Sequence, residues 1–399
     1  READRLLAEL HFFAGPGLRL LALPDHESLP YDPFSPHPDL VSERLRALAA
    51  LPELARGIVV TTRAVVLGRL PPRRFIAAHS FDLRRGERID VTALRARLAL
   101  AGYAHVSQVQ SPGEIAVRGS VIDVFPGGAA QPLRLDLFDD VIESIRAFDP
   151  EDQRSGEHLE RVALLPAREF PTSPEAIAGF RGRWRERFEG DPQQCPLYRA
   201  VSAGHAPAGI EAWMPLFFDA TALLADYLPA TALVVDTVDL ERALPLAWAE
   251  IAERYEDRRH DRERPLLAPE EAFVPPAEAA ARLAAHARVQ VTVTKAEPLG
   301  STGPFHNFGS EPPPDLRIDP RALVPPAALL ASLASHGDRV LLLADSAGRR
   351  ELLLGVLRDA GHEPRPLPDW PAFHGGAERF AIAVAADVRG LVLPAHGLQ

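Results

Sequence analysis

The sequence predicts an α/β protein that carries an inserted small β-rich domain and, further along the chain, another small α/β domain. Three observations lead to this fold class. Apolar strands flank a capped helix between residues 18 and 62, the hydrophobic period switches to two between residues 105 and 149, and a strand–helix–strand pattern returns between residues 339 and 384. The first and third patterns are typical of an α/β layer, whereas a period of two is typical of a half-buried sheet.

The first layer begins with two short apolar runs, residues 18–23 and 57–62, which we expect to be buried strands. A proline-rich loop over residues 24–38 follows the first strand. Asp39 is placed to cap a helix that extends to about Ala50, because a side-chain oxygen at that position can accept the unpaired amide protons of the first turn.

The β-rich domain follows a predicted helix over residues 92–101, which Gly102 closes. One of its strands alternates between an apolar face and a charged face. The apolar positions are Leu133, Leu135 and Leu137, and the opposite positions are Arg134, Asp136 and Phe138. The preceding strand places Glu114, Ala116 and Arg118 on its polar side. A phenylalanine between charges predicts a docking surface, and the alternative is that another element of the protein covers Phe138.

Ser173 and Pro174 begin a helix that extends to about Glu189. Its arginines are interpreted as a solvated face rather than a nucleic-acid-binding stripe, because Glu186 and Glu189 interrupt them. These arginines are Arg181, Arg183, Arg185 and Arg187. Residues 233–236 are predicted to be a buried strand that ends in Asp236. The proline-rich residues 312–326 are predicted to form a linker.

Composition limits the classes of function. The formal net charge of −11 disfavours a protein that coats DNA regardless of sequence. The single cysteine, Cys195, excludes an internal disulfide and a cysteine-based zinc site. No apolar run is long enough to span a membrane. We therefore expect a cytoplasmic monomer, and the absence of an initiator methionine suggests a piece of a longer protein.

The residues of a nucleotide-hydrolysing centre are missing. A phosphate-binding P-loop needs a glycine-rich turn followed by lysine, and the only lysine, Lys295, has no such turn before it. Asp236 stands where an ATPase would place a magnesium-binding acid, but no catalytic glutamate follows it. The adjacent Asp139 and Asp140 fit a hairpin turn better than a metal site. We expect no catalytic residue, metal or cofactor in this segment.

Two motifs carry a family resemblance. Residues 113–126 (GEIAVRGSVIDVFP) and 134–143 (RLDLFDDVIE) resemble the domain shared by the excision-repair protein UvrB and the transcription-repair coupling factors, the Mfd family. Residues 27–36 (ESLPYDPFSP) and 209–218 (GIEAWMPLFF) resemble the coupling factors more closely than UvrB. The resemblance covers essentially the whole chain, although it is weak over residues 325–399.

The resemblance implies a degenerate P-loop-helicase-like fold and four domains. These are residues 1–84 (α/β, incomplete at its N-terminal end), 85–165 (β-rich and UvrA-binding), 166–312 (α/β) and 325–399 (small α/β). It also implies a non-catalytic adaptor that recruits UvrA through Arg118, Arg134 and Phe138. RNA polymerase, double-stranded DNA, ATP and magnesium would be bound by parts of the parent DNA translocase that this chain lacks. The alternative is a UvrB-type nucleotide-dependent motor or a DNA-binding domain.

Overall fold

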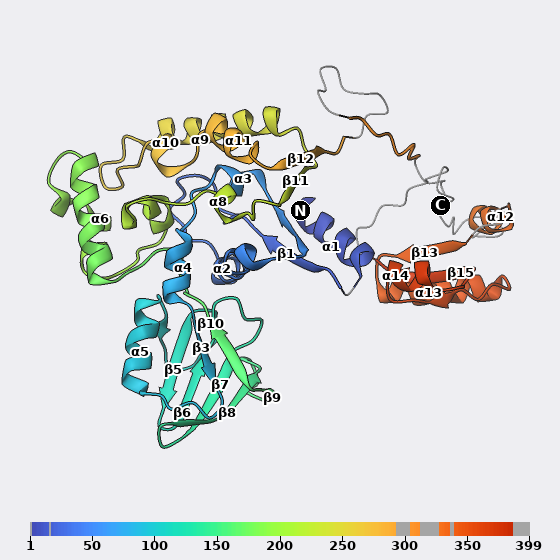
Figure 1. The fold of residues 1–399 in the computed structure, drawn as a ribbon, viewed down its shortest axis with the longest axis horizontal. Helices are drawn as coiled ribbons and strands as arrows, with labels where there is room; N and C mark the ends of the chain where they lie inside the picture. Colours follow the sequence, from blue (N-terminus) through green and yellow to red (C-terminus); the bar gives the residue numbers. More distant parts are fainter. Residues whose placement is uncertain (1, 16, 293–303, 312–326, 336–338, 386–399) are drawn as a thin grey trace. The chain divides into compact units, whose positions relative to one another are not determined.

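The protein is an α/β protein, as the sequence predicts (Figure 1). Its computed structural model describes residues 2–15, 17–292, 304–311, 327–335 and 339–385. The chain divides into two compact units, which are described separately. The larger unit comprises residues 21–55 and 61–291, and the smaller comprises residues 1–20, 56–60 and 292–399.

The first predicted layer contributes to both units, because residues 19–20 of its first strand and residues 57–60 of its second strand belong to the smaller unit. The elements of this layer are β1 (Arg19–Leu23), α2 (Pro38–Ala50), η1 (Leu51–Glu53), β2 (Gly57–Thr61), α3 (Arg63–Leu67) and α4 (Arg73–His79). Helix α2 buries Leu45 and Leu48. The predicted cap was wrong, because His37 is the N-cap and its Nδ1 accepts the amide proton of Asp39 at 3.3 Å. Asp39 instead lies in the first turn, where its negative charge interacts favourably with the positive end of the helix dipole.

The β-rich domain is built on a six-stranded sheet with strand order β4-β5-β6-β7-β8-β9. These strands are β4 (Ala104–His105), β5 (Glu114–Arg118), β6 (Val121–Val124), β7 (Leu133–Phe138), β8 (Val141–Phe148) and β9 (Ser155–Leu159). All neighbours are antiparallel except β4 and β5. The strand that enters the domain, β3 (Phe81–Arg84), pairs antiparallel with the strand that leaves it, β10 (Arg161–Leu164).

Helix α5 (Val91–Leu100) packs on the apolar side of this domain. Asp90 caps it by accepting the amide protons of Thr92 and Ala93, and Gly102 ends it with φ of +91°. Its Leu94 and Leu98 belong to one hydrophobic core with the sheet. The predicted inward residues of β7, namely Leu133, Leu135 and Leu137, are buried in this core.

The rest of the larger unit is mostly helical. Its elements are α6 (Pro174–Arg187), η2 (Pro192–Gln194), α7 (Pro196–Ser202), η3 (Ile210–Phe217), α8 (Leu224–Tyr227), β11 (Leu233–Asp236), α9 (Leu240–Arg258), α10 (Pro269–Ala272), α11 (Pro276–Leu283) and β12 (Ala287–Gln290). Ser173 caps α6, as predicted. Strands β11 and β12 pair in parallel. The strand predicted over residues 233–236 is present as β11, but the prediction that it is buried was wrong for Leu233 and Val235, which are exposed.

The described part of the smaller unit includes the predicted strand–helix–strand pattern near the C-terminal end. Its elements are α1 (Glu2–Ala14), α12 (Ala327–Ser335), β13 (Val340–Ala344), α13 (Ala347–Asp359), β14 (Arg365–Pro366), α14 (Trp370–Gly375) and β15 (Phe380–Val384). The three strands form a parallel sheet with order β13-β15-β14. Phe12 of α1 is buried against Ala383 and Ala385. The predicted linker over residues 312–326 lies outside the described residues.

Across the described ranges, none of the helices is both long and apolar enough to cross a lipid bilayer. The division into four domains remains a prediction.

Candidate partner-binding face

The open side of the six-stranded sheet carries two rows of side chains that cross β5 to β8. The first row is Ala116, Asp123, Arg134 and Arg146. The second row is Arg118, Val121, Asp136 and Ser144. Asp123 on β6 is paired with Arg134 on β7, and paired residues point to the same side of a sheet. Arg118 lies two residues after Ala116, the partner of Asp123 on β5, so it points to that side as well.

Phe138 is the last residue of β7, and its side chain is 70% exposed. The β7–β8 hairpin is irregular, with a shift of register between Asp136 and Leu137 and a φ of +54° at Asp139. The turn is nevertheless held from outside, because the amide of Ile89 donates to the carbonyl of Asp140 at 2.7 Å. The described part of the chain therefore displays Phe138 on a supported hairpin without covering it.

Arg134 is held in place by a buried carboxylate. Its Nε donates to Oδ1 of Asp123 at 2.7 Å and its Nη2 donates to Oδ2 at 2.9 Å, while Asp123 is only 1% exposed. The guanidinium also lies 4.6 Å from the ring centroid of Phe148 and donates to Oε1 of Gln153 at 3.0 Å. The hydrogen bonds to Asp123 raise the pKa of Arg134, so this side chain is a fixed cation.

Arg118 contacts the same carboxylate from the other side. Its Nη2 donates to Oδ2 of Asp123, the oxygen that Arg134 also uses. The Arg118 side chain is 51% exposed, whereas that of Arg134 is 18% exposed. We refer to Arg118, Arg134 and Phe138 together as the docking face.

A second ion pair continues this polar network on β7 and β8. Asp136 accepts hydrogen bonds from Arg146 and, at 2.6 Å, from the hydroxyl of Ser144. Burial raises the pKa of Asp136, but these two donors lower it by more, so the carboxylate stays ionised. The face therefore presents alternating charges around the two arginines rather than a uniform basic surface.

Part of this side of the sheet is covered. Ala116, predicted on the polar side, is buried in a small cluster with Val109, Phe125 and Phe148. The segment that leads into β5 therefore shields one end of the sheet. This cover explains why the Phe148 ring can contact the guanidinium of Arg134 and still be buried.

The sequence reasoning missed two contributors to the face, Asp123 and Arg146. The signal for Asp123 was present, because it alternates with Ile122 and Val124 and so must point away from the core. Its ion pairs could not be read from that pattern, since they depend on which strands are neighbours.

The other candidate residues do not assemble a second site. Asp236 is paired with Arg288, whose Nη2 lies 2.5 Å from its Oδ2, so this carboxylate already has a cationic partner. Within the described ranges, no three His, Cys, Asp or Glu side chains are grouped to hold a metal ion.

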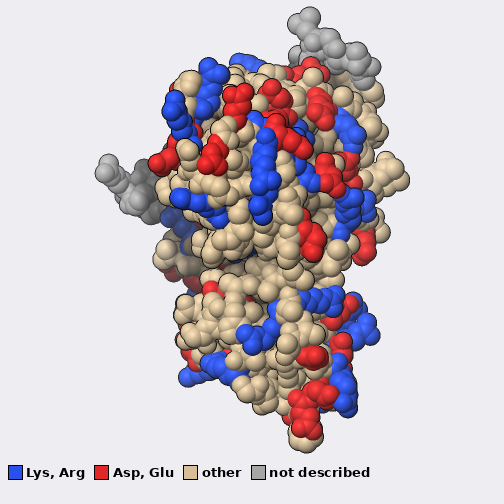
Figure 2. Space-filling model, turned by 90° about the vertical axis from the view of Figure 1, so that its left-hand side faces the viewer, with Lys and Arg blue, Asp and Glu red and all other residues tan. Residues whose placement is uncertain are grey.

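The arginines of α6 are largely engaged within the protein. Arg183 donates to Asp219 and to the carbonyl of Leu216, and Arg187 donates to Glu271. The molecular face in Figure 2 shows acidic and basic side chains intermingled. This arrangement favours a solvated surface over a nucleic-acid-binding stripe.

Comparison with known proteins agrees with the motifs on the sheet. Residues 81–170 match the UvrB interaction domain, and residues 333–399 match the MFD D3 domain. Over 337 residues, or 84% of this chain, the sequence is 41% identical to the transcription-repair-coupling factor of Escherichia coli (strain K12). It is 35% identical to that of Haemophilus influenzae over 93% of the chain, and 33% identical to that of Myxococcus xanthus over 68%.

The β-rich fold and these matches define a protein that contains a UvrB interaction domain. More specifically, the chain belongs to the transcription-repair-coupling factor family, a family of DNA-repair proteins. It spans 29% of the length of the E. coli relative and 32% of the H. influenzae relative.

Proposed function

We propose that this chain is a non-catalytic adaptor that recruits UvrA to lesions at which RNA polymerase has stalled. The observation that supports this most is the exposure of Phe138 on a supported hairpin of the sheet whose open side carries Arg118 and Arg134, inside the segment that matches the UvrB interaction domain. An aromatic side chain that becomes buried on binding, with charged hydrogen-bond donors around it, is typical of the residues that contribute most to the binding energy of a protein interface. Phe138 would enter a pocket of UvrA, and Arg118 and Arg134 would donate around it.

The activities of the whole protein are part of this proposal. ATP-driven translocation on double-stranded DNA, with its ATP and magnesium, and contact with RNA polymerase would reside outside this chain. The segment itself would act in the cytoplasm as a monomer.

Phe138→Ala tests the proposal by isothermal titration of the chain with UvrA. Truncating such an interface residue costs about 2 kcal/mol or more, so we expect the dissociation constant to rise about thirtyfold. The fold should not change, because Phe138 takes no part in the core.

Phe34→Ala is the matched control. Phe34 is 71% exposed, nearly the same as Phe138, but it lies in the loop before α2. Its loss should leave UvrA binding unchanged. Equal dissociation constants for the wild type and for folded Phe138→Ala would refute the proposed contact.

A further inference from the structure

Two guanidinium groups on the docking face share one carboxylate. Arg134 occupies both oxygens of Asp123, at 2.7 and 2.9 Å, and Arg118 donates to one of these same oxygens. Two positive charges therefore surround one negative charge, and the three groups together carry an excess of one positive charge. We assign this excess positive charge to Arg118, which is more exposed than Arg134.

The two arginines are held to different degrees. Arg134 makes a two-point contact with Asp123, a further hydrogen bond to Gln153 and a stacking contact with Phe148. Arg118 makes a single-donor contact with an oxygen that Arg134 already neutralises. Losing the Arg118 contact would leave Asp123 paired, whereas losing the Arg134 contact would leave a buried charge poorly compensated.

We propose that Asp123 is a positioning residue for UvrA binding. Asp123 fixes the orientation of Arg134 through two hydrogen bonds and orients Arg118 through one. Arg118 is then the guanidinium that contacts the partner. This inference rests on the proposed function. The partner would supply an oxygen acceptor to Arg118, while the Asp123–Arg134 pair would stay intact beneath it. Because the arginines are ordered before binding, association would not have to restrict them.

Asp123→Asn tests this role, because asparagine keeps the shape of the side chain and removes its charge. We expect UvrA to bind this variant about fivefold or more weakly, since the arginines must then be ordered during association. Adding Arg118→Ala to Asp123→Asn should weaken binding by less than Arg118→Ala does in the wild type, because the two residues act as one unit. Full additivity would contradict the shared role.

A spectroscopic signature separates positioning from general stability. In the wild type the Nε proton of Arg134 should exchange slowly with water and give a resolved resonance, because Asp123 accepts it in a buried site. That resonance should be lost in Asp123→Asn while the backbone amide resonances of β7 stay in place. Fast exchange of this proton in the wild type would overturn the proposed geometry.

Lysine substitutions provide a test that leaves Asp123 intact. Lysine keeps the charge of arginine but cannot make the planar two-point contact. Arg134→Lys should therefore weaken UvrA binding several-fold more than Arg118→Lys does, although both variants keep the same net charge. Equal effects of the two substitutions would contradict the assigned roles.

The outcomes distinguish this inference from the proposed function. If the folded wild type does not bind UvrA, the proposed function fails and the role of Asp123 in binding fails with it. If the wild type binds and Phe138→Ala loses affinity while Asp123→Asn binds normally, only the positioning role is wrong.

Discussion

Glu169 follows β10, the last strand of the β-rich domain, and binds two side chains of the first α/β layer. Its Oε1 accepts from Nε of Arg44 on α2 at 2.8 Å, and its Oε2 lies 2.7 Å from Nε2 of His26. Burial raises the pKa of Glu169, but the Coulombic attraction of Arg44 and His26 outweighs that effect and holds the pKa at about 2. The carboxylate is thus ionised in the folded protein under ordinary conditions.

A depressed pKa makes this carboxylate a pH-dependent source of stability. Its contribution is present above the ordinary pKa of about 4.5 and is lost as the pH falls toward 2, and it amounts to about 3 kcal/mol at neutral pH. Glu169→Gln should therefore lower the urea midpoint at pH 7, measured by the fluorescence of the buried Trp184 and Trp213. The difference from the wild type should shrink between pH 4.5 and 2. A difference that did not change with pH would show that the charge of Glu169 is not the source.

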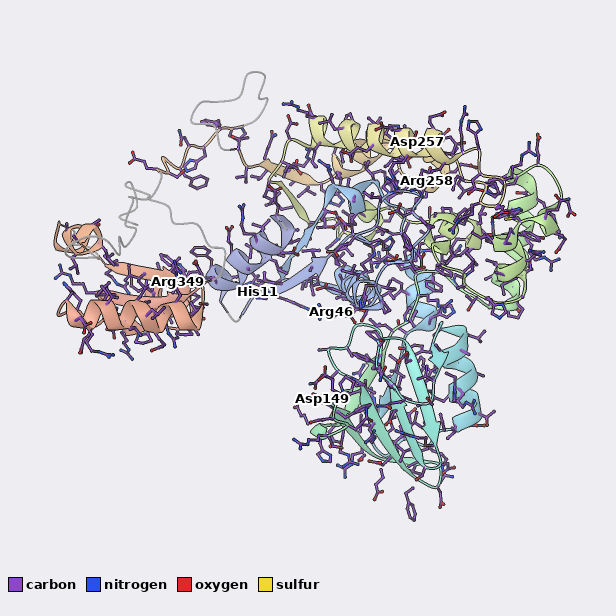
Figure 3. The ribbon with its side chains drawn as sticks, turned by 180° about the vertical axis from the view of Figure 1, so that it is seen from behind. His11, Arg46, Asp149, Asp257, Arg258 and Arg349 are labelled. Carbon is purple, nitrogen blue, oxygen red and sulfur yellow. The ribbon has the colours of Figure 1, made fainter. Side chains whose placement is uncertain are left out.

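At the scale of elements, the turn between β6 and β7 contacts α2 closely. The amide of Gly128 donates to the hydroxyl of Ser42 at 2.7 Å, and φ of Gly128 is +83°. A Cβ placed on Gly128 would lie 3.0 Å from Cβ of Arg46 and 2.9 Å from Cδ1 of Leu165. Arg46 is labelled on α2 in Figure 3. This position has neither the conformational freedom nor the space for a side chain.

Gly128→Ala and Gly119→Ala form a matched pair that separates crowding from backbone strain. Both glycines have positive φ, but a Cβ on Gly119 would meet nothing within 4 Å. We expect Gly119→Ala to cost about 1 kcal/mol from strain alone, and Gly128→Ala to cost about 2 kcal/mol more from the clash with α2. Hydrogen–deuterium exchange of the β6 and β7 amides measures this difference. Equal exchange rates in the two variants would rule out the contact with α2 as a source of stability.

Local sequence patterns predicted the helices and strands well, but they did not predict which side chains from different strands are in contact. The alternation in β7 correctly placed Leu135 in the core and Phe138 outside it, because the two faces of a strand depend only on its own period. The cap of α2 was missed because histidine is not among the residues that usually favour that position. The pairing of Asp123 with two arginines could not be predicted, since it requires the register of three strands.

At the scale of the whole molecule, we expect the chain not to bind nucleotide. The carboxylate of Asp236 is paired with Arg288, and the only lysine of the chain, Lys295, lies outside the described residues. We predict that ATP with magnesium leaves the melting temperature of this chain unchanged. A nucleotide present at one hundred times its dissociation constant would add about 2.7 kcal/mol of stability. A clear upward shift in a thermal-melting assay would restore the nucleotide-dependent alternative.

The antiparallel pairing of β3 with β10 has a consequence for how such domains spread among proteins. Phe81 at the entrance of the β-rich domain is the partner of Leu164 near its exit, so the chain enters and leaves the domain at adjacent points. A segment whose two ends meet in this way can be inserted into a surface loop of another protein with little disturbance to that host. Because Arg118, Arg134 and Phe138 all lie between β3 and β10, inserting this segment into another protein would transfer the whole docking face with it.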